Sequence, residues 1–568
     1  MKNWSTSTRA TIAIVIVLIG LLVYRSAHYN RLAHVIAHEV ATPRSLDAAR
    51  GLIVRKRLAR VFKDRPDQAK KQAIRTAQVF AADRHIVDVE DHHVSMAEAA
   101  AGAMVDFLSD MELPVRATAA DALTRMGKPA VRPLIDVALT SPDKDVRSNA
   151  SRALQAIGEV AVPEMIDAIK GGSPSQKVGC AGAIGKLKSP RAIDGLVGAL
   201  SAKEEEVRLA CRDALVAMDD AAVKPLIGAL TNKDAFTRQH ACEALGEIGD
   251  KAAAVPLLKN IDDENRLVRL AATYAVGKVQ DKGATAALIV KMRDKDRGIR
   301  EAAAVSLGQL ADQSAVAPLI AALSDPVDKV REQAAASLGR IAPNDGASLA
   351  AIEAACNSAD EGTRGAAVFA LGRIGNAAAI PAIAGRLAHD PAVLVRQRAA
   401  RALGELKSPA AIPALLSAFE DKDWHVNYAA QEGLAALGKP AVTSLIGVLS
   451  GSDALLARYA RKALVRMDPA PVVELVALTA KGQPVDIRVN ATIALGEIAS
   501  AETTAALEKL KDDAAPQMAE AAKQALVVRA TPAVGAETAP AASAAAAASA
   551  APAKAEAKTA EPAKTDAP

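Results

Sequence analysis

Residues 395–406 read VRQRAARALGEL, and variants of this stretch return along the chain at intervals of 30 to 33 residues. In most copies the first, fifth, eighth, ninth and twelfth residues are apolar or small, which places them on one face of an α-helix. The repetition predicts fourteen amphipathic helices, whose copies begin at Val115, Val146, Gln176, Val207, Thr237, Val268, Ile299, Val330, Thr363, Val395, Val426, Leu456, Ile487 and Met518.

The fifth residue of the repeated stretch is Ala or Cys in all fourteen copies, so only a small side chain is accepted there. Eight copies also place Gly directly after the aliphatic ninth residue, as at Gly246, Gly308 and Gly404. Because Gly inside a helix costs about 1 kcal/mol relative to Ala, its repeated use predicts that a neighbouring helix approaches closely at this point. We therefore expect tightly stacked layers of helices.

Ahead of each of these helices lies another amphipathic stretch, such as AAVKPLIGAL from Ala221. A Pro near the beginning of such a stretch is expected in the first turn of a helix, where its missing N–H is not needed. The repeating unit is therefore predicted to be a helical hairpin. Asp residues fall in the hairpin turn, where they are placed to cap the second helix, and they include Asp143, Asp234, Asp360 and Asp423.

The pattern V-R-x-x-A-A-x-A-L-G-x-I resembles the HEAT-repeat family, and specifically the short HEAT-like repeats of phycobilin lyases and many bacterial adaptor proteins. The resemblance covers residues 96–529. It implies an all-α fold, an α-solenoid of about fourteen hairpins in which each hairpin buries its apolar face against its neighbours. Because the repeated positions build the stack, no functional residue is carried over, and the resemblance implies a surface that binds other proteins.

The apolar stretch at residues 10–24, ATIAIVIVLIGLLVY, follows a short N-terminal segment, residues 1–9. As a helix it would span roughly 22 Å, short of a ~30 Å hydrocarbon core, unless Arg9 snorkels and the residues before it extend the span. We predict a transmembrane anchor. The alternative is a cleaved signal peptide, although no small-x-small cleavage site follows the apolar stretch.

The segment 25–95 is predicted to be a basic, helical juxtamembrane region and cap for the stack. Residues 25–75 contain thirteen Lys or Arg against four Asp or Glu. A basic segment beside a membrane resists translocation and is attracted to anionic lipid. We therefore expect a single-pass membrane protein with its array on the cytoplasmic face. A periplasmic, exported array is the alternative, because Lys2 and Arg9 reduce the charge asymmetry across the helix.

Residues 530–568 are rich in Ala and Pro, carry balanced charges and lack an apolar period. Such a segment cannot bury enough apolar surface to offset the entropy of ordering, so we expect a disordered tail. The predicted array therefore ends at Arg529.

The formal net charge of +5 hides a separation of charge along the chain. Residues 1–75 have fifteen basic and four acidic residues, so the remainder of the chain is acidic overall. Proteins that bind nucleic acids need a basic excess to neutralise phosphates. The expected partners are therefore other proteins and the membrane, and not nucleic acid.

Three of the four cysteines, Cys180, Cys211 and Cys242, lie 31 residues apart, one in each of three successive repeats. One cysteine per repeat does not suggest a disulfide framework. We interpret them as reduced thiols in the core.

Some HEAT-like proteins are enzymes, so catalysis is the alternative to a scaffold. Deoxyhypusine hydroxylase, which has this repeat type, binds iron through several His-Glu pairs, whereas this chain has one such pair, His38-Glu39, outside the array. A bilin lyase would need a pocket with aromatic and polar contacts, and only 2% of the residues are aromatic. We predict no catalytic, cofactor-binding or metal-binding residue and no cofactor; a bilin-lyase-like or metal-dependent protein is the alternative.

The densest cluster of potential metal ligands is HIVDVEDHH at residues 85–93, with three imidazoles and three carboxylates. It would bind a divalent ion if the loop brought these groups together. Nothing in the sequence fixes that geometry, so a solvated loop is the preferred interpretation. His34 and His38 are four residues apart on one predicted helix face and are interpreted as surface residues.

Arg occupies the second position in ten copies of the repeat. Two interpretations are open: a basic stripe that binds an acidic partner, or a structural ladder in which each Arg pairs with Asp residues of neighbouring turns. The ladder is the preferred interpretation. Its members are Arg116, Arg147, Arg208, Arg238, Arg269, Arg300, Arg331, Arg364, Arg396 and Arg488.

Two consecutive copies lack this Arg and have Asn427 and Ala457 in its place. The same region holds several aromatic residues, including the only Trp beyond Trp4. Because aromatic side chains are frequent anchors of interfaces, we predict a partner-binding site in this membrane-anchored scaffold; the alternative is that the Trp covers a seam between repeats. The predicted site residues are Trp424, His425, Asn427, Tyr428 and Tyr459.

Overall fold

The structure, a computed structural model, describes residues 101–102, 104–109 and 113–530, and all regular secondary structure within these ranges is helical. The predicted all-α fold is therefore confirmed for this part of the chain. No helix within these ranges is long and apolar enough to span a membrane. The predicted anchor at 10–24, the flanking segments 1–9 and 25–95, and the predicted tail beyond Ala530 lie outside the described residues.

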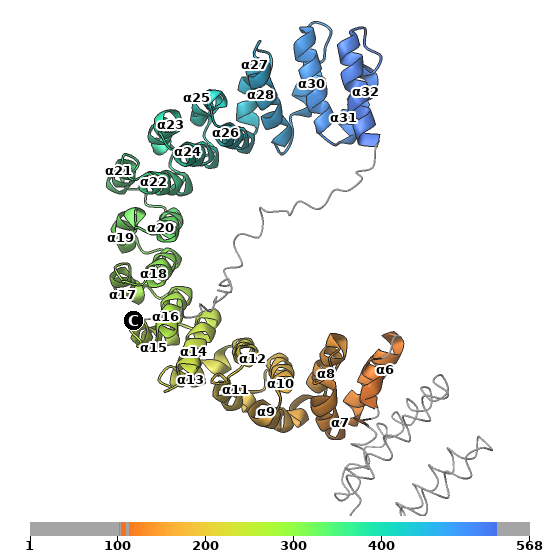
Figure 1. The fold of residues 1–568 in the computed structure, drawn as a ribbon, viewed down its shortest axis with the longest axis vertical. Helices are drawn as coiled ribbons and strands as arrows, with labels where there is room; N and C mark the ends of the chain where they lie inside the picture. Colours follow the sequence, from red (N-terminus) through yellow and green to blue (C-terminus); the bar gives the residue numbers. More distant parts are fainter. Residues whose placement is uncertain (1–100, 103, 110–112, 531–568) are drawn as a thin grey trace, which may run out of the picture. The chain divides into compact units, whose positions relative to one another are not determined.

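The chain divides into two units, the first ending at Pro318 and the second beginning at Leu319. Within each unit the helices form a stack of hairpins, in which the second helices of successive hairpins pack side by side (Figure 1). All fourteen predicted copies of the repeated stretch lie in second helices, so the predicted repeat is confirmed. In the first unit these helices are α6 (Leu113–Met126), α8 (Lys144–Ile157), α10 (Pro174–Leu187), α12 (Glu205–Ala217), α14 (Ala235–Ile248), α16 (Arg266–Val279) and α18 (Arg297–Leu310). In the second unit they are α20 (Asp328–Ile341), α22 (Glu361–Ile374), α24 (Val393–Glu405), α26 (Trp424–Leu437), α28 (Ala454–Arg466), α30 (Val485–Glu497) and α32 (Pro516–Ala530).

The first helices of the hairpins are shorter, and several combine an α-helix with one turn of another helix type. In the first unit they are η2 (Asp106–Ser109), α7 (Lys128–Pro133) with the π-helix η3 (Leu134–Ala138), η4 (Gly158–Ala161) with α9 (Val162–Gly171), η5 (Pro190–Ala192) with α11 (Ile193–Ala199), α13 (Asp220–Ala229), η6 (Lys251–Ala253) with α15 (Ala254–Asn260), η7 (Lys282–Ala284) with α17 (Thr285–Lys291), and η8 (Gln313–Ala315). The division between the units falls within α19 (Val316–Ala321). The second unit continues with η9 (Ala322–Ser324), α21 (Gly346–Ala355), η10 (Ala377–Ala379) with α23 (Ile380–His389), η11 (Pro409–Ala411), α25 (Ile412–Ser417) and η12 (Ala418–Glu420), α27 (Lys439–Leu449), α29 (Val472–Leu478) and α31 (Ala501–Leu510).

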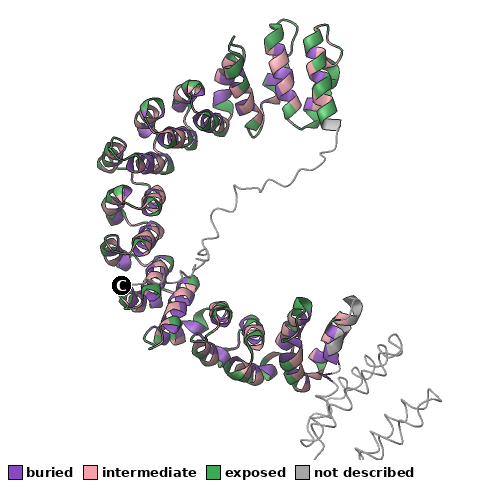
Figure 2. Cartoon of the chain, viewed as in Figure 1, coloured by how far each residue is buried: buried purple, intermediate pink, exposed green. Residues whose placement is uncertain are grey.

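The core of each unit is the seam between stacked hairpins. The fifth residue of every copy is at most 1% exposed, so these small side chains lie in the core. Buried residues of each helix lie on the sides that face its neighbours (Figure 2). The cysteines are free and buried, and burial raises the pKa of the Cys180, Cys211 and Cys356 thiols to about 12. All four are therefore free core thiols, and the prediction made for Cys180, Cys211 and Cys242 is confirmed.

The glycines of the second helices mark close contacts between neighbouring helices. A Cβ atom on Gly246 of α14 would lie 2.8 Å from the Cα atom of Ala275 on α16. A Cβ atom on Gly404 of α24 would lie 2.5 Å from the Cα atom of Gly433 on α26. Both distances are shorter than a normal van der Waals contact, so the predicted close approach is confirmed at these two seams.

The hairpin turns cap the second helices as predicted. The carboxylate of Asp360 accepts a hydrogen bond from the backbone N–H of Thr363 at 2.7 Å, which satisfies one of the free donors of the first turn of α22. The same role is filled at α8, α14 and α26 by Asp143, Asp234 and Asp423.

In α13, the first helix of its hairpin, the Pro does not lie in the first turn as expected. The helix begins at Asp220, so Pro225 lies inside it and leaves one backbone acceptor without its usual helical donor. The earlier start follows from the tight turn after α12, where Asp219 adopts a positive φ of 55°. The apolar pattern alone does not reveal this turn geometry.

Candidate functional site

In seven copies of the repeat, the Arg at the second position binds the turn of its own hairpin. The Nη1 atom of Arg364 donates to the carbonyl oxygens of Ser358 and Ala359, both at 3.0 Å. Both carbonyls lie in the turn between α21 and α22, so the Arg side chain ties this turn to the second helix. The same pair of bonds, to the residues six and five positions earlier, is made by Arg147, Arg208, Arg238, Arg269, Arg300 and Arg396.

Three of these guanidinium groups also join one repeat to the next through bidentate bonds. Arg364 donates from Nε and Nη2 to the two carboxylate oxygens of Asp390, at 2.8 and 2.9 Å. This bidentate arrangement is repeated by Arg238 with Asp263 and by Arg396 with Asp421. Arg and Asp are both buried at these seams. The ladder interpretation is therefore confirmed for these arginines, and they are not free to form a basic stripe for a partner.

One rung of the ladder uses a histidine in place of the Asp. Arg208 donates from Nε to Nε2 of the buried His240 at 3.3 Å, and His240 Nδ1 lies 2.9 Å from Glu243 Oε2. Since Nε2 accepts the bond from Arg208, Nδ1 carries the proton and donates it to Glu243. Burial raises the pKa of Glu243, but hydrogen bonds from His240, Gln239 and Arg212 outweigh it and lower that pKa to about 2.

The ladder is interrupted at α26 and α28. Asn427 is 4% exposed, and its side-chain Nδ2 lies within 3.1 Å of the carbonyl oxygens of Ala418, Phe419 and Asp421. The shorter amide thus performs the Arg's role within its own hairpin but does not reach the next repeat. Asn427 was predicted as a partner-binding residue; because it is buried and bound within the chain, it does not belong to an exposed docking surface.

Aromatic contacts replace the missing rung between α26 and α28. The rings of Phe419 and Tyr459 meet edge to face, with centroids 5.7 Å apart. Arg466 of α28 lies over the ring of Tyr428, 4.6 Å from its centroid, and donates to Gln431 Oε1 at 2.8 Å. Even so, α26 and α28 pack less extensively against each other than α24 and α26 do. Tyr459 therefore belongs mainly to the seam.

The first turn of α26 exposes a large aromatic surface. Trp424 is 64% exposed and stacks on the neighbouring His425, with ring centroids 3.7 Å apart. Tyr428, one turn later on the same helix face, is 37% exposed. Most of the indole faces solvent, which does not fit the alternative that Trp424 covers a seam between repeats. The structure thus brings Trp424, His425 and Tyr428 together on one exposed face.

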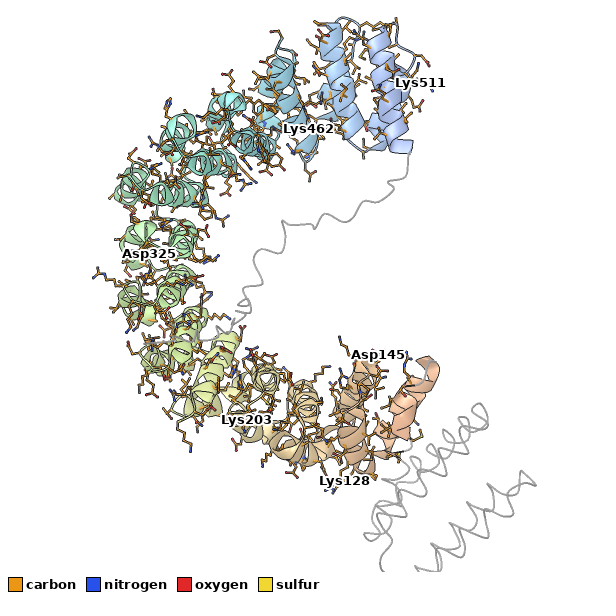
Figure 3. All side chains as sticks on the ribbon, viewed as in Figure 1. Lys128, Asp145, Lys203, Asp325, Lys462 and Lys511 are labelled. Carbon is orange, nitrogen blue, oxygen red and sulfur yellow. The ribbon has the colours of Figure 1, made fainter. Side chains whose placement is uncertain are left out.

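The adjacent helix α28 adds residues that the sequence analysis did not select. Leu455 is exposed in the first turn of α28, as Trp424 is in the first turn of α26. The helix also carries four cations and no carboxylate. Three of them follow Leu455 along one helix face, and Figure 3 labels the central one, Lys462. We define the α26–α28 surface as Trp424, His425, Tyr428, Leu455, Arg458, Lys462 and Arg466.

Other sites raised by the sequence lie elsewhere. The cluster at 85–93 and the histidines His34 and His38 lie outside the described residues. Over the ranges that the structure covers, no three His, Cys, Asp or Glu side chains are grouped as a metal site requires.

Comparison with known proteins identifies relatives of this chain. Over 62 residues it is 50% identical to the bilin biosynthesis protein PecE of Nostoc sp. (strain PCC 7120 / SAG 25.82 / UTEX 2576), a match covering 11% of this chain and 24% of PecE. The chain therefore spans about a quarter of the length of this relative. Among solved structures it is similar to Kap121p bound to Nup53p, at 13% identity, with 89% of this chain and 67% of that chain covered and a TM-score of 0.44. It is also similar to importin beta, at 15% identity, with 86% and 69% covered and a TM-score of 0.42.

The sequence profile described as HEAT repeats matches the chain in five overlapping or neighbouring segments, at residues 101–175, 204–277, 255–339, 316–397 and 386–465. Together they make up more than half of the 568 residues. The matched segments contain most of the ladder arginines, from Arg116 to Arg396, and most of the small fifth residues described above. The chain therefore belongs to the HEAT-repeat family.

Proposed function

We propose that this chain is a membrane-anchored scaffold that binds other proteins through its helical repeats, and that the α26–α28 surface is one of its docking sites. The observation that carries the proposal is the exposed indole of Trp424, in the stretch where the ladder is interrupted. A Trp left largely in solvent gains more than most side chains when a partner desolvates it. Tyr428 lies beside it and extends the same apolar surface.

Removing both aromatic rings should abolish binding at this surface. With a photo-reactive benzophenone residue in place of Leu455, we expect cross-links to specific proteins in intact cells. Trp424→Ala with Tyr428→Ala should reduce their yield at least about tenfold, because each interface anchor typically contributes about 2 kcal/mol. The measurement is the cross-link yield at equal protein levels.

The matched control places the same benzophenone at Val290, an exposed apolar residue of α17 in the first unit. It should not give the same cross-links. Cross-links that persist unchanged in the double Ala variant, or that form equally from Val290, would contradict docking at the α26–α28 surface.

Membrane attachment is part of the proposal. Residues 10–24 would span the membrane once, the basic segment after them would lie against anionic lipid, and the array would face the cytoplasm. We expect full-length protein to resist extraction by alkaline carbonate, whereas a variant lacking residues 1–24 should be soluble. Protease added to right-side-out vesicles should leave the array intact. Cleavage of the array there would instead support the exported orientation, and carbonate extraction of the full chain would contradict the anchor.

A second candidate function, the handling of a bilin, is favoured by the 62-residue similarity to PecE. The absorption spectrum of protein purified from its native cells distinguishes the two. A scaffold should show no visible absorption, whereas a stoichiometric visible chromophore would favour the bilin function.

A further inference from the structure

The α26–α28 surface combines an apolar end with a line of cations that outnumber their carboxylate partners. In α28, Leu455, Arg458, Lys462 and Arg466 are spaced three, four and four residues apart, so they follow one face of the helix. Leu455 in the first turn of α28 and Trp424 in the first turn of α26 are exposed and provide the apolar end. From Leu455 to Arg466 the line is about 16 Å long at 1.5 Å per residue.

The cations of α28 have too few carboxylates to balance them. Arg461 and Lys462 share one carboxylate, Glu497 of α30, at 3.5 and 2.9 Å. Arg466 is bound to neutral groups, the ring of Tyr428 and the amide of Gln431. Arg458 is exposed and has no hydrogen bond or ion pair within the described residues.

Arg461 shows the effect of this imbalance on a neighbouring group. Its Nε atom is buried and makes no hydrogen bond. Burial, together with the repulsion from Arg458, lowers the pKa of Arg461 below its ordinary value, although Glu497 acts in the opposite direction. An added negative charge beside Arg458 would relieve this repulsion.

We propose that the α26–α28 surface binds an acidic segment of a partner protein, in which one aromatic or aliphatic side chain is followed by carboxylates. The apolar side chain would pack against Trp424 and Leu455, and the carboxylates would pair with Arg458, Lys462 and Arg466. An extended segment of about five residues matches the 16 Å line at about 3.3 Å per residue. This inference rests on the proposed docking function and adds the chemistry of the partner.

The test uses the full chain in detergent and a short fluorescein-labelled peptide in which one Phe precedes Glu residues at every second position. Fluorescence anisotropy should show binding that weakens as salt is added. The variant Arg458→Glu with Lys462→Glu should lower the affinity at least tenfold. The control Lys439→Glu with Lys509→Glu, which changes the net charge equally at exposed sites on α27 and α31, should leave it within about twofold.

Two further probes define the chemistry. Replacing Glu by Lys in the peptide should abolish binding, and replacing Phe by Ser should weaken it in the wild-type chain but not in Trp424→Ala. Equal binding of the Lys peptide, or equal affinity in the charge-reversed variant, would overturn the inference. Tighter binding of single-stranded DNA or of phosphatidylserine vesicles at the same cations would also overturn it, because the site would then select another class of ligand.

Failure of this inference is distinguishable from failure of the docking function. If the cross-links formed at Leu455 are lost in the aromatic double variant but persist in the charge-reversed variant, the surface docks proteins by apolar contact and the acidic-segment inference is wrong. If neither variant alters the cross-links, the docking function itself is wrong.

Discussion

Replacement of Asp390 by Ala is expected to lower the free energy of unfolding of the second unit by about 3 to 5 kcal/mol. The Asp390 carboxylate is fully buried and accepts two hydrogen bonds from Arg364. Arg386 Nη1 also lies 3.6 Å from Asp390 Oδ2. Removing it leaves the Arg364 guanidinium buried without an anion, which is the costly way to break such a pair. Urea unfolding of the full chain measures the change.

Two further variants separate the cost of leaving Arg364 unpaired from the loss of a carboxylate as such. Asp512→Ala removes an exposed carboxylate of the same unit and should change stability by less than about 0.5 kcal/mol. Arg364→Met combined with Asp390→Leu removes both charges and should recover most of the loss. A loss in Asp390→Ala no greater than that in Asp512→Ala would show that the ladder does not stabilise the stack.

The same pair predicts a dependence on pH. Burial raises the pKa of Asp390, but the hydrogen bonds from Arg364 lower it by more. The pKa of Asp390 in the folded state is therefore below its ordinary value. An unfolded Asp titrates at about pH 4, so the stability that Asp390 contributes is present above that pH. This stability is lost as the pH falls through the lower pKa of the folded state. The difference between wild type and Asp390→Ala should persist at pH 5 to 7 and shrink below about pH 4.

Gly404→Ala is expected to destabilise the second unit by about 1 to 3 kcal/mol, although Ala is the better helix former. The new Cβ atom would lie 2.5 Å from the Cα atom and 3.2 Å from the carbonyl carbon of Gly433. These are backbone atoms, so α24 and α26 must move apart to admit the methyl group. Urea unfolding measures the loss of stability, and hydrogen exchange of the α24 and α26 amides measures where the loss occurs.

Gly447→Ala is the matched control for this substitution. Gly447 is an exposed residue of α27 with nothing within 4 Å of the added Cβ atom. This change should stabilise the helix by about 0.5 to 1 kcal/mol. Because hairpins contact mainly their neighbours, the faster exchange caused by Gly404→Ala should be confined to nearby helices. Stabilisation by both substitutions would show that the Gly positions do not reflect close packing.

Much of the fold follows from the repeat because its signals are local. The apolar face, the small fifth residue and the capping Asp each act within one hairpin or against an identical neighbour, as Ala399 and Asp423 illustrate. The start of α13 was not predictable in this way, because the tight turn at Asp219 lies between two apolar patterns. The replacement of an Arg by Asn427 was visible in the sequence, but the burial and bonding of the Asn were not. A buried amide that reaches three carbonyl oxygens cannot be told from an exposed polar residue by sequence alone.

The sequence by itself determined the helical hairpins, their number within the array, their capping and the small residues at their seams, because a periodic pattern needs no information beyond its own period. It also indicated the region of the candidate site through its aromatic residues. Only the tertiary structure decided which of those side chains are exposed, since Asn427 is buried on the turn of its own hairpin and Tyr459 packs against Phe419, while Trp424 faces solvent. It also decided which partners the cations of α28 have, because charge balance depends on neighbours from other repeats. Arg461 and Lys462 share Glu497, and Arg466 lies over the ring of Tyr428.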